Sequence, residues 1–359
     1  MMTPKYNFLL PAYKPDFFKE ALDSILGQTY RDFKLIILDD CSPYDLKSIV
    51  DEYDDDRITY YRNEENMGGK SLVACWNKLL GLADSEYIIL ASDDDVYEVN
   101  FLEEMDRLAR KYPEVDLLRA RCQMYNKKNN IAFYDGIYQE LTDSLEFVYL
   151  MYRHDSIKCI ANYVFKLSAL KGIGGFIDFP LAWFSDRATV MKLSKNGVAN
   201  SKDVLFMFRM SDVNITFGKN DEKKAYIKEY ATRLYDKWFK DFIAPFEKQE
   251  PKMTAYQKGM LASAVGTHNE LMKTELVRYL PTLSFKHFWE YVRLLDERLY
   301  RFYCFLVYVK ERGKGFFGLA MGGEGAGKVL VNKYVKNFRI LGSFSEKAYI
   351  CNLKFKKRE

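Results

Sequence analysis

Residues 86–97 read EYIILASDDDVY, and this stretch decides the fold. It begins with a short apolar run, Tyr87–Leu90, of the kind that forms a buried strand, and it leads into three consecutive acids, Asp93 to Asp95. Three adjacent carboxylates repel one another unless solvent or a cation relieves them. Because ligands of open α/β sheets bind beyond the carboxyl ends of the strands, we interpret this stretch as a strand that ends at a ligand site.

The same pattern recurs upstream. YNFLL at residues 6–10 and FKLIIL at residues 33–38 are further strand-like runs, and the second also ends in two acids. Residues 15–28 and 70–83 have apolar side chains at helical spacing. Short strands that alternate with helices predict βαβ units, and therefore an α/β fold with a mostly parallel, Rossmann-like sheet flanked by helices.

The character of the sequence changes near residue 218. Beyond about Asp221, segments such as residues 222–242 are long, helical and rich in charge, and strand signals become weak. A chain of 359 residues has the length of two domains. We therefore predict an α/β domain over residues 1–218 and a mainly helical C-terminal appendage over residues 219–359.

Composition excludes several classes of protein. Hydrophobic residues make up 48% and charged residues 29% of the chain, which excludes intrinsic disorder. Six scattered cysteines and three histidines suit neither a disulfide framework nor a zinc site. No apolar run approaches the ~18 residues that a membrane span needs. Because the N-terminal MMTPKYNFLLPAY resembles neither a signal nor a transit peptide, we expect a cytoplasmic protein.

Charge is distributed unevenly along the chain. Residues 300–359 contain 13 lysines and arginines and four acids, a net charge of +9 within a total of +4, so the remainder carries −5. Two interpretations of this basic tail remain open: a solvated chain end, or contact with an anionic membrane surface, where each basic residue contributes about 1 kcal/mol. An acidic body without a recognition module argues against nucleic acid as a partner.

The acids at residues 93–95 suit a metal-bound diphosphate. Hard divalent cations prefer oxygen ligands, and Mg²⁺ is commonly held by one or two carboxylates together with substrate phosphates. The alternative is a solvated loop with a helix N-cap, and the three acids alone would favour that alternative. Their position after a buried strand, with a second acidic strand end upstream, favours the metal site.

Four stretches together resemble the inverting glycosyltransferases of family 2, which have the GT-A fold. They are PAYKP at 11–15, SILGQTYRDFKLIILDD at 24–40, NEENMGGK at 63–70 and EYIILASDDDVY at 86–97. The resemblance covers roughly residues 5–215. It implies transfer of a sugar from a nucleotide-diphosphate sugar, UDP-linked, to a hydroxyl of a glycan or lipid-linked oligosaccharide acceptor in surface polysaccharide synthesis. It also implies Mg²⁺ or Mn²⁺ as cofactor, and the membrane interpretation of the basic tail would suit a lipid-linked acceptor at the cytoplasmic face of a membrane.

The resemblance assigns roles to individual residues of the donor site. The base and ribose pocket is assigned to Pro11, Ala12, Tyr13 and Asp40, while Asn66 and Lys70 fall where the family contacts the nucleotide or its phosphates. The DXD motif of the family maps onto Ser92-Asp93-Asp94, so that Asp93 faces the ribose, Asp94 binds the metal and Asp95 is an accessory metal ligand. A register slip of one residue in this motif stays open, as does a purely solvated role for Lys70.

A transferase of this type also needs a general base that takes a proton from the acceptor hydroxyl. In the family this is an acid beyond the DXD motif, after a glycine-rich turn, and residues 172–194 (GIGGFIDFPLAWFSDRATVMKLS) fit that description. The expected base is Asp186, and Trp183-Phe184 supply aromatic surface for a sugar face. Two alternatives remain: Asp186 or Ser185 merely caps a helix, or Asp178 is the base. Arg153 and His154 either meet a phosphate or lie on the surface.

Two rival functions stay open, and one apparent motif is rejected. Because Ser92 replaces the usual first acid of the DXD motif, a catalytically silent nucleotide-sugar-binding or scaffold protein is the main alternative. A nucleotidyltransferase is disfavoured, because PAYKPDF contains no glycine for a phosphate loop. GGEGAGKV at residues 322–329 imitates a P-loop, but Val329 stands where the motif requires a hydroxyl.

Overall fold

The computed structural model describes residues 3–125, 130–210, 221–279, 282–284 and 287–289. By their contacts, the described residues of 1–218 and of 234–264 form one compact unit, which we call the α/β unit. The described residues of 219–233 and of 265–289 form a second unit. The division of the chain into two domains at residue 218 stays a prediction. The basic tail and the glycine-rich residues 322–329 lie outside the described residues.

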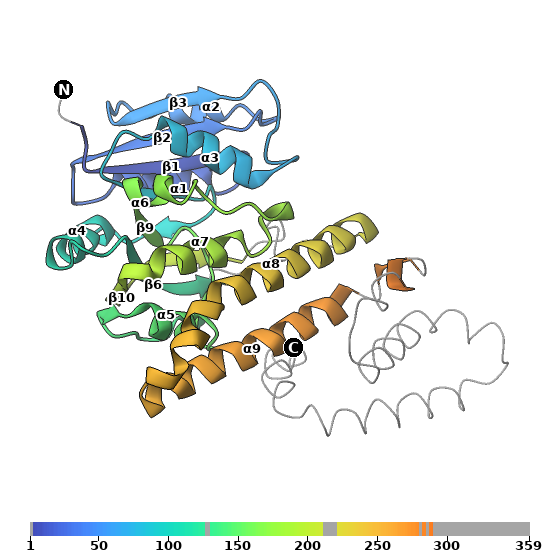
Figure 1. Ribbon diagram of the computed structural model, residues 1–359. Helices are drawn as coiled ribbons and strands as arrows, with labels where there is room; N and C mark the ends of the chain where they lie inside the picture. The colour runs from blue at the N-terminus through green and yellow to red at the C-terminus, as the bar shows by residue number, and fades with distance from the viewer. Residues whose placement is uncertain (1–2, 126–129, 211–220, 280–281, 285–286, 290–359) are drawn as a thin grey trace. The chain divides into compact units, whose positions relative to one another are not determined.

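The α/β unit is built on one sheet, which has ten strands within the described residues. Eight of them run in the order β3-β2-β1-β4-β9-β6-β10-β5, while β7 pairs with β6 and β8 pairs with β10 beside this path (Figure 1). The strands are β1 (Tyr6–Ala12), β2 (Phe33–Asp39), β3 (Ile58–Arg62), β4 (Tyr87–Leu90), β5 (Val96–Tyr97), β6 (Leu117–Tyr125), β7 (Ile131–Tyr134), β8 (Leu141–Thr142), β9 (Tyr163–Lys166) and β10 (Val198–Arg209). The run β3-β2-β1-β4 is parallel, as is the pair β6-β10, whereas β9 is antiparallel to both of its neighbours. The predicted α/β fold with a mostly parallel sheet is confirmed.

The central position of β1 and β4 follows from their sequences. Every residue of β4 is buried, and in β1 only Pro11 is partly exposed. A parallel strand that is covered on both faces needs such continuous apolar sequence. Parallel pairing with β1 extends from Tyr6–Phe33 to Ala12–Asp39 in β2 and from Tyr6–Tyr87 to Leu9–Leu90 in β4. This register brings the residues that follow β1, β2 and β4 to one edge of the sheet.

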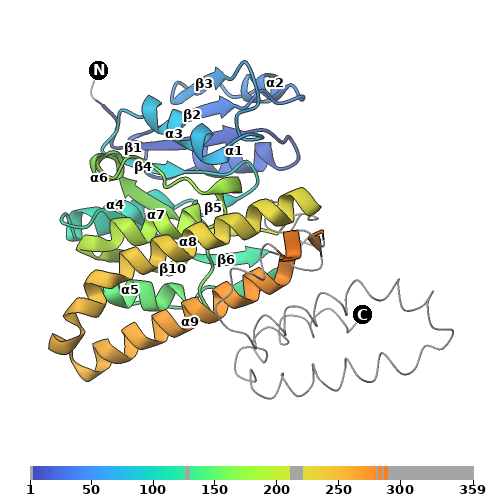
Figure 2. The same ribbon diagram turned by 45° about the vertical axis from the view of Figure 1, so that its right-hand side comes forward.

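Helices pack on the sheet of the α/β unit, and α1 to α7 lie between its strands in sequence (Figure 2). They are α1 (Phe18–Leu26), α2 (Leu46–Val50), α3 (Leu72–Leu82), α4 (Phe101–Lys111), α5 (Ser144–Met151), α6 (Leu167–Gly172), α7 (Ser185–Leu193), α8 (Glu222–Gln249) and α9 (Ala255–Tyr279), with short 3₁₀ turns at Pro180–Ala182, Ser194–Asn196 and Glu250–Lys252. The packing partners of α3 are β1 and β2, and those of α4 are β6 and β10. Their buried faces are the apolar stripes that the sequence predicts.

The predicted helical segment at residues 222–242 is confirmed as part of α8, which spans 28 residues. Its residues before 234 belong to the second unit, and those from Leu234 onward belong to the α/β unit. Across the described residues, we find no helix with the length and apolarity to cross a bilayer.

Candidate active site

The carboxyl edge of the parallel strands brings together residues that are far apart in sequence. The side-chain oxygen Oδ2 of Asp93, which follows β4, accepts hydrogen bonds from the backbone N–H groups of Tyr13 (3.0 Å) and Lys14 (2.9 Å), which follow β1. Burial raises the pKa of the Asp93 carboxyl, and the charge of Lys14 opposes that shift. Asp93 thus fastens two loops of the predicted donor site to each other.

Asp94 and Asp95 have different surroundings, although they are adjacent. The hydroxyl of Ser92 donates to Oδ1 of Asp94. In contrast, Oδ1 of Asp95 accepts the backbone N–H of Arg209 at 2.9 Å, and Nε of Arg209 donates to the backbone carbonyl of Asp94 at 3.0 Å. Burial, followed by the charge of Asp94, raises the pKa of Asp95 well above its ordinary value. Asp95 therefore ties the end of β10 to the acidic loop.

The donor set at the acidic loop can be tested against a divalent cation. Within the described part of the chain, no three His, Cys, Asp or Glu side chains are grouped so that they could hold a metal ion. Mg²⁺ needs only one or two carboxylates when substrate phosphates complete its shell. Asp94, buried and adjacent to Asp93 and Asp95, fits that smaller requirement. The metal assignment of Asp94 and Asp95 stays a prediction.

Asp40 holds the loop between β3 and α3. Its carboxylate accepts from the side-chain amide of Asn63 (2.7 Å) and from the backbone N–H groups of Met67 (2.8 Å) and Gly68 (2.6 Å). The same loop carries Asn66, whose side-chain oxygen accepts from the backbone N–H of Gly69. Asp40 thereby shapes the predicted nucleotide-contacting loop from within.

The other predicted donor residues lie along the same edge. Pro11 and Ala12 are the last residues of β1, and the ring of Tyr13 is 38% exposed beyond them. Lys70 forms an exposed ion pair with Glu65 at 2.6 Å, which is the arrangement expected of a solvated surface residue. Its predicted contact with the donor phosphates stays a prediction.

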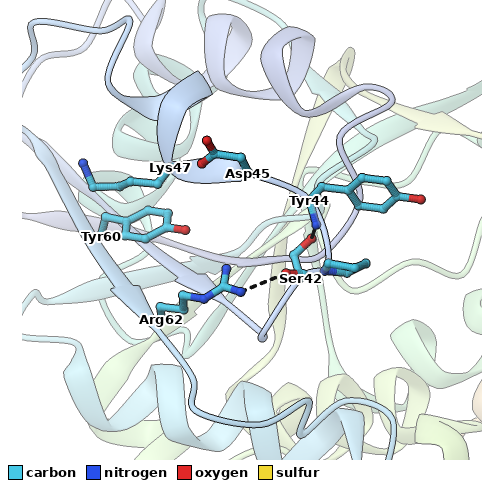
Figure 3. Close-up of a pocket in the computed structure, with 7 residues that line it drawn as sticks. Ser42, Tyr44, Asp45, Lys47, Tyr60 and Arg62 are labelled. Atoms are coloured by element: carbon cyan, nitrogen blue, oxygen red, sulfur yellow. Dashed lines mark hydrogen bonds between the residues drawn. The ribbon is translucent and has the colours of Figure 1, made fainter.

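A pocket of about 460 Å³ lies beside this edge, where β2 and β3 end (Figure 3). Its lining includes Ser42, Tyr44, Lys47, Tyr60 and Arg62. The hydroxyl of Ser42 donates to the backbone carbonyl of Tyr13 at 2.7 Å, which joins the pocket wall to the loop after β1.

Asp39 anchors the pocket wall, and sequence analysis did not single it out. Its carboxylate accepts from Arg62, from the hydroxyl of Tyr60 at 2.6 Å and from the N–H of Ser42 at 2.7 Å. The sequence signal that could have identified Asp39 is a basic residue, Arg62, at the end of one predicted strand and an acid at the equivalent end of the neighbouring strand.

The glycine-rich turn before the predicted base depends on backbone conformations that favour glycine. Gly174 and Gly175 have φ values of 90° and 91°. A Cβ atom on Gly175 would lie 2.5 Å from Oδ1 of Asn77, and this oxygen accepts the N–H of Phe176 at 2.8 Å. The side chain of Asn77 on α3 therefore fixes the start of the loop that leads to Asp186.

Asp186 lies in the first turn of α7 and does not cap it. The N-cap position is Phe184, and the hydroxyl of Ser185 accepts the N–H of Phe179 at 3.0 Å. The capping interpretation of Asp186 and Ser185 is therefore wrong. Burial raises the pKa of Asp186, and the charges of Arg187 and Lys158 oppose that shift. A carboxylate with a raised pKa is a stronger base than an ordinary aspartate.

Burial is the largest cause that raises the pKa of the Cys159 thiol well above its ordinary value, and the charges of Asp95 and Asp186 act in the same direction. Asp178, the alternative base, is exposed and accepts from the hydroxyl of Ser71 at 3.3 Å.

One aromatic residue of the predicted acceptor site differs from expectation, whereas Arg153 and His154 lie on the surface, which is one of their two interpretations. Phe184 is buried and its ring stacks on that of Tyr235, so the prediction that it presents a face to a sugar is wrong. The ring is turned inward because residues after 234, which sequence analysis assigned to the appendage, pack against this loop. Arg153 is exposed and pairs with Asp155 at 2.7 Å, and His154 is exposed.

Comparison with known proteins identifies the family of part of the chain. Residues 8–165 match the family model described as Glycosyl transferase family 2. An uncharacterized glycosyltransferase of Methanocaldococcus jannaschii is 30% identical over 136 residues, which are 36% of this chain and 46% of that protein. The GalNAc(5)-diNAcBac-PP-undecaprenol beta-1,3-glucosyltransferase of Campylobacter jejuni is 35% identical over 97 residues, which are 26% of this chain and 30% of that protein. The chain thus spans less than half the length of these relatives.

The fold also has a counterpart among solved structures. Residues 1–349 of TarS from S. aureus, crystallised in complex with UDP-GlcNAc, superpose with a TM-score of 0.52 and 15% identity. The superposition covers 86% of this chain and 92% of that one. At this identity the likeness concerns the fold, and it supports the GT-A architecture of the sheet.

Proposed function

We propose, from the premise that residues 8–165 belong to glycosyltransferase family 2, that this chain is an inverting glycosyltransferase. It moves a sugar from a nucleotide-diphosphate sugar to a hydroxyl of a glycan or lipid-linked oligosaccharide. The proposed donor is a UDP-sugar. The observation that carries the proposal is the junction at Asp93, whose carboxylate accepts the backbone N–H groups of Tyr13 and Lys14. It places the acidic loop beside the predicted nucleotide loop.

The donor half of the site is assigned to the ends of β1, β2 and β4. Tyr13 offers a partly exposed ring for the base, Asp40 shapes the 63–68 loop, and Asp93 faces the ribose. Asp94 is the proposed ligand of Mg²⁺ or Mn²⁺, and Asp95 is the proposed accessory ligand. When bound, the cation supplies positive charge that stabilises the departing nucleoside diphosphate.

The acceptor half is assigned to the start of α7. Asp186 accepts the proton of the acceptor hydroxyl, and the oxygen attacks the anomeric carbon as the bond to the diphosphate breaks. Attack from the face opposite the leaving group inverts the anomeric configuration. A carboxylate that is partly withdrawn from water, with a raised pKa, suits a base that must take a proton from a weakly acidic hydroxyl.

The acceptor class is proposed from a relative and from charge. The Campylobacter jejuni relative is named for action on an undecaprenol-linked saccharide. A lipid-linked acceptor lies at a membrane surface, and the +9 charge of residues 300–359 suits contact with anionic lipid headgroups. We therefore place the enzyme in surface polysaccharide synthesis at the cytoplasmic face of a membrane.

Donor binding and transfer are tested separately on the purified full chain. UDP-GlcNAc, UDP-glucose and GDP-mannose, each with and without Mn²⁺, are screened by thermal shift, and nucleoside diphosphate release is followed with saccharide acceptors. We expect Mn²⁺-dependent stabilisation by one donor, acceptor-dependent release, and an inverted anomer by NMR. Binding without release under any acceptor would support the silent nucleotide-sugar-binding alternative. A retained anomer would overturn the inverting mechanism.

A further inference from the structure

The loop that leads to Asp186 has a strained backbone. Three residues without the freedom of glycine, Leu181, Ala182 and Phe184, have φ values of 59°, 54° and 69°. Side chains with a Cβ atom rarely adopt this region, so each of these residues is strained. A strained segment of this kind persists only where surrounding contacts determine it, so the contacts of this loop show what positions the predicted base.

One side chain on α8 contacts both ends of the loop. The ring of Tyr235 stacks on that of Phe184, with 4.5 Å between ring centroids and 10° between ring planes. It also meets the ring of Phe179 edge-on at 6.0 Å and 79°. Phe179 and Phe184 are the two ends of the strained loop, so a single ring touches both.

Tyr235 is itself firmly held. It has no exposed surface, and its hydroxyl shares a hydrogen bond of 2.9 Å with the hydroxyl of Tyr152, which follows α5. Phe239, one turn further along α8, packs edge-on against Tyr152 at 5.4 Å. This part of α8 belongs to the α/β unit, and it runs beside α7 in Figure 1 and Figure 2.

We propose that Tyr235 is a positioning residue for Asp186. Its ring fixes Phe184 in the left-handed conformation, and Asp186 follows two residues later in the first turn of α7. Loss of the ring would let the loop relax and move the carboxylate away from its attacking position, while the donor loops after β1 and β4 stay in place. The proposal rests on the proposed function. Tyr235 lies outside the segment that matches the family model, which ends at residue 165.

The test separates donor binding from transfer. Tyr235→Leu removes the stacked ring, and Tyr235→Phe keeps it. We expect Tyr235→Leu to lower kcat for transfer by at least ~10-fold, because small displacements of a reacting group cost up to ~100-fold. The affinity for UDP with Mn²⁺, measured by calorimetry, should change less than about twofold, since no donor residue moves. Tyr235→Phe should recover kcat to within about threefold of the parent chain, because stacking needs no hydroxyl.

Matched variants distinguish positioning from general destabilisation. Ile243→Ala removes a buried apolar side chain from the same helix, two turns beyond Tyr235, and should lower Tm without lowering kcat of the folded protein. If Tyr235→Leu does not fold, Phe184→Leu removes the same stack from the loop side and should give the same loss of kcat. The double variant with Tyr235→Leu and Phe184→Leu should lose no more kcat than either single variant, because both substitutions remove the same contact.

Two outcomes would overturn the proposal. The first is a Tyr235→Leu or Phe184→Leu variant that transfers sugar at the parent rate. The second is a loss of kcat and UDP affinity in equal proportion, which would mean that Tyr235 only supports the fold. A parent chain that transfers no sugar would instead refute the proposed function, so the two failures are distinguishable.

Discussion

At the residue scale, the three consecutive acids after β4 have three different partners. The carboxylate of Asp93 accepts hydrogen bonds from the loop after β1, and that of Asp94 accepts one from the hydroxyl of Ser92. The carboxylate of Asp95 accepts the backbone N–H of Arg209 at the end of β10. Their mutual repulsion is relieved by separate N–H and O–H donors. Ser92, which departs from the usual motif, supports Asp94 with a hydrogen bond, so the departure does not by itself argue against a functional site.

Asp186→Asn is expected to remove the proposed base without disturbing the donor site. General base catalysis contributes ~10²–10⁴-fold, so kcat for transfer should fall by that amount while UDP affinity persists. Asp178→Asn is the matched control, because Asp178 is the alternative base and is exposed. Steady-state kinetics decide between them: near-normal turnover of Asp186→Asn with loss in Asp178→Asn would reverse the assignment.

Asp94→Ala is expected to lose metal-dependent donor binding. The Asp94 carboxylate is the proposed metal ligand, and substrate phosphates complete the shell of such an ion. Calorimetric titration of UDP with and without Mn²⁺ measures the effect: Mn²⁺ should strengthen UDP binding to the parent chain and have little effect on the variant. Equal enhancement by Mn²⁺ in both proteins would refute Asp94 as the ligand.

At the scale of elements, two loops are positioned by side chains on neighbouring elements. The 63–68 loop depends on the carboxylate of Asp40 after β2, and the 172–186 loop depends on the amide of Asn77 on α3. Both loops border α3, one at its N-terminus and one along its side. This helix therefore couples the predicted donor loop to the loop of the predicted base.

Gly175→Ala is expected to destabilise the turn before the base. The residue has φ 91°, and an added Cβ would lie 2.5 Å from Oδ1 of Asn77. Strain of this kind amounts to about 1–3 kcal/mol of unfolding free energy, measurable by urea denaturation. Gly172→Ala is the control, since nothing lies within 4 Å of its added Cβ. Equal stability of the two variants would contradict the role of Asn77.

At the scale of the whole molecule, stability should depend on pH through buried charges near the site. Burial, followed by the charge of Arg187, lowers the pKa of Lys158 to about 7. In the unfolded chain the lysine keeps its proton to about pH 10.4. Between these values the unfolded state binds more protons than the folded one, so the free energy of unfolding rises with pH.

Lys158→Met is expected to flatten this rise. One such lysine makes the free energy of unfolding rise by up to about 1.4 kcal/mol per pH unit between pH 7 and pH 10. The variant has no lysine at this position and therefore lacks this contribution. Urea unfolding at pH 7, 8 and 9 measures the difference between the parent chain and the variant. Lys202→Met, at an exposed position on β10, is the control and should follow the parent. Parallel curves for all three proteins would refute the lowered pKa of Lys158.

The sequence by itself determined the alternation of strands and helices and the acids at strand ends. These features are local: short continuous apolar runs such as Tyr87–Leu90 are typical of buried strands, and carboxylates that follow such strands lie at the edge of the sheet. The strand boundaries predicted for β1, β2 and β4 differ from the structure by no more than two residues. The predicted base stayed at the start of a helix, although its N-cap proved to be Phe184.

Only the tertiary structure decided which acids accept hydrogen bonds from the protein and which side chains hold the loop before Asp186. Asp39, Asp40 and Asp95 look alike in sequence, and their partners come from residues at least three and up to 114 positions away. Likewise Tyr235 reads as one aromatic among many on an amphipathic helix, yet its ring closes the loop before Asp186. Such contacts join residues that are distant in sequence, and no local pattern encodes them, because they depend on how the helices and strands pack.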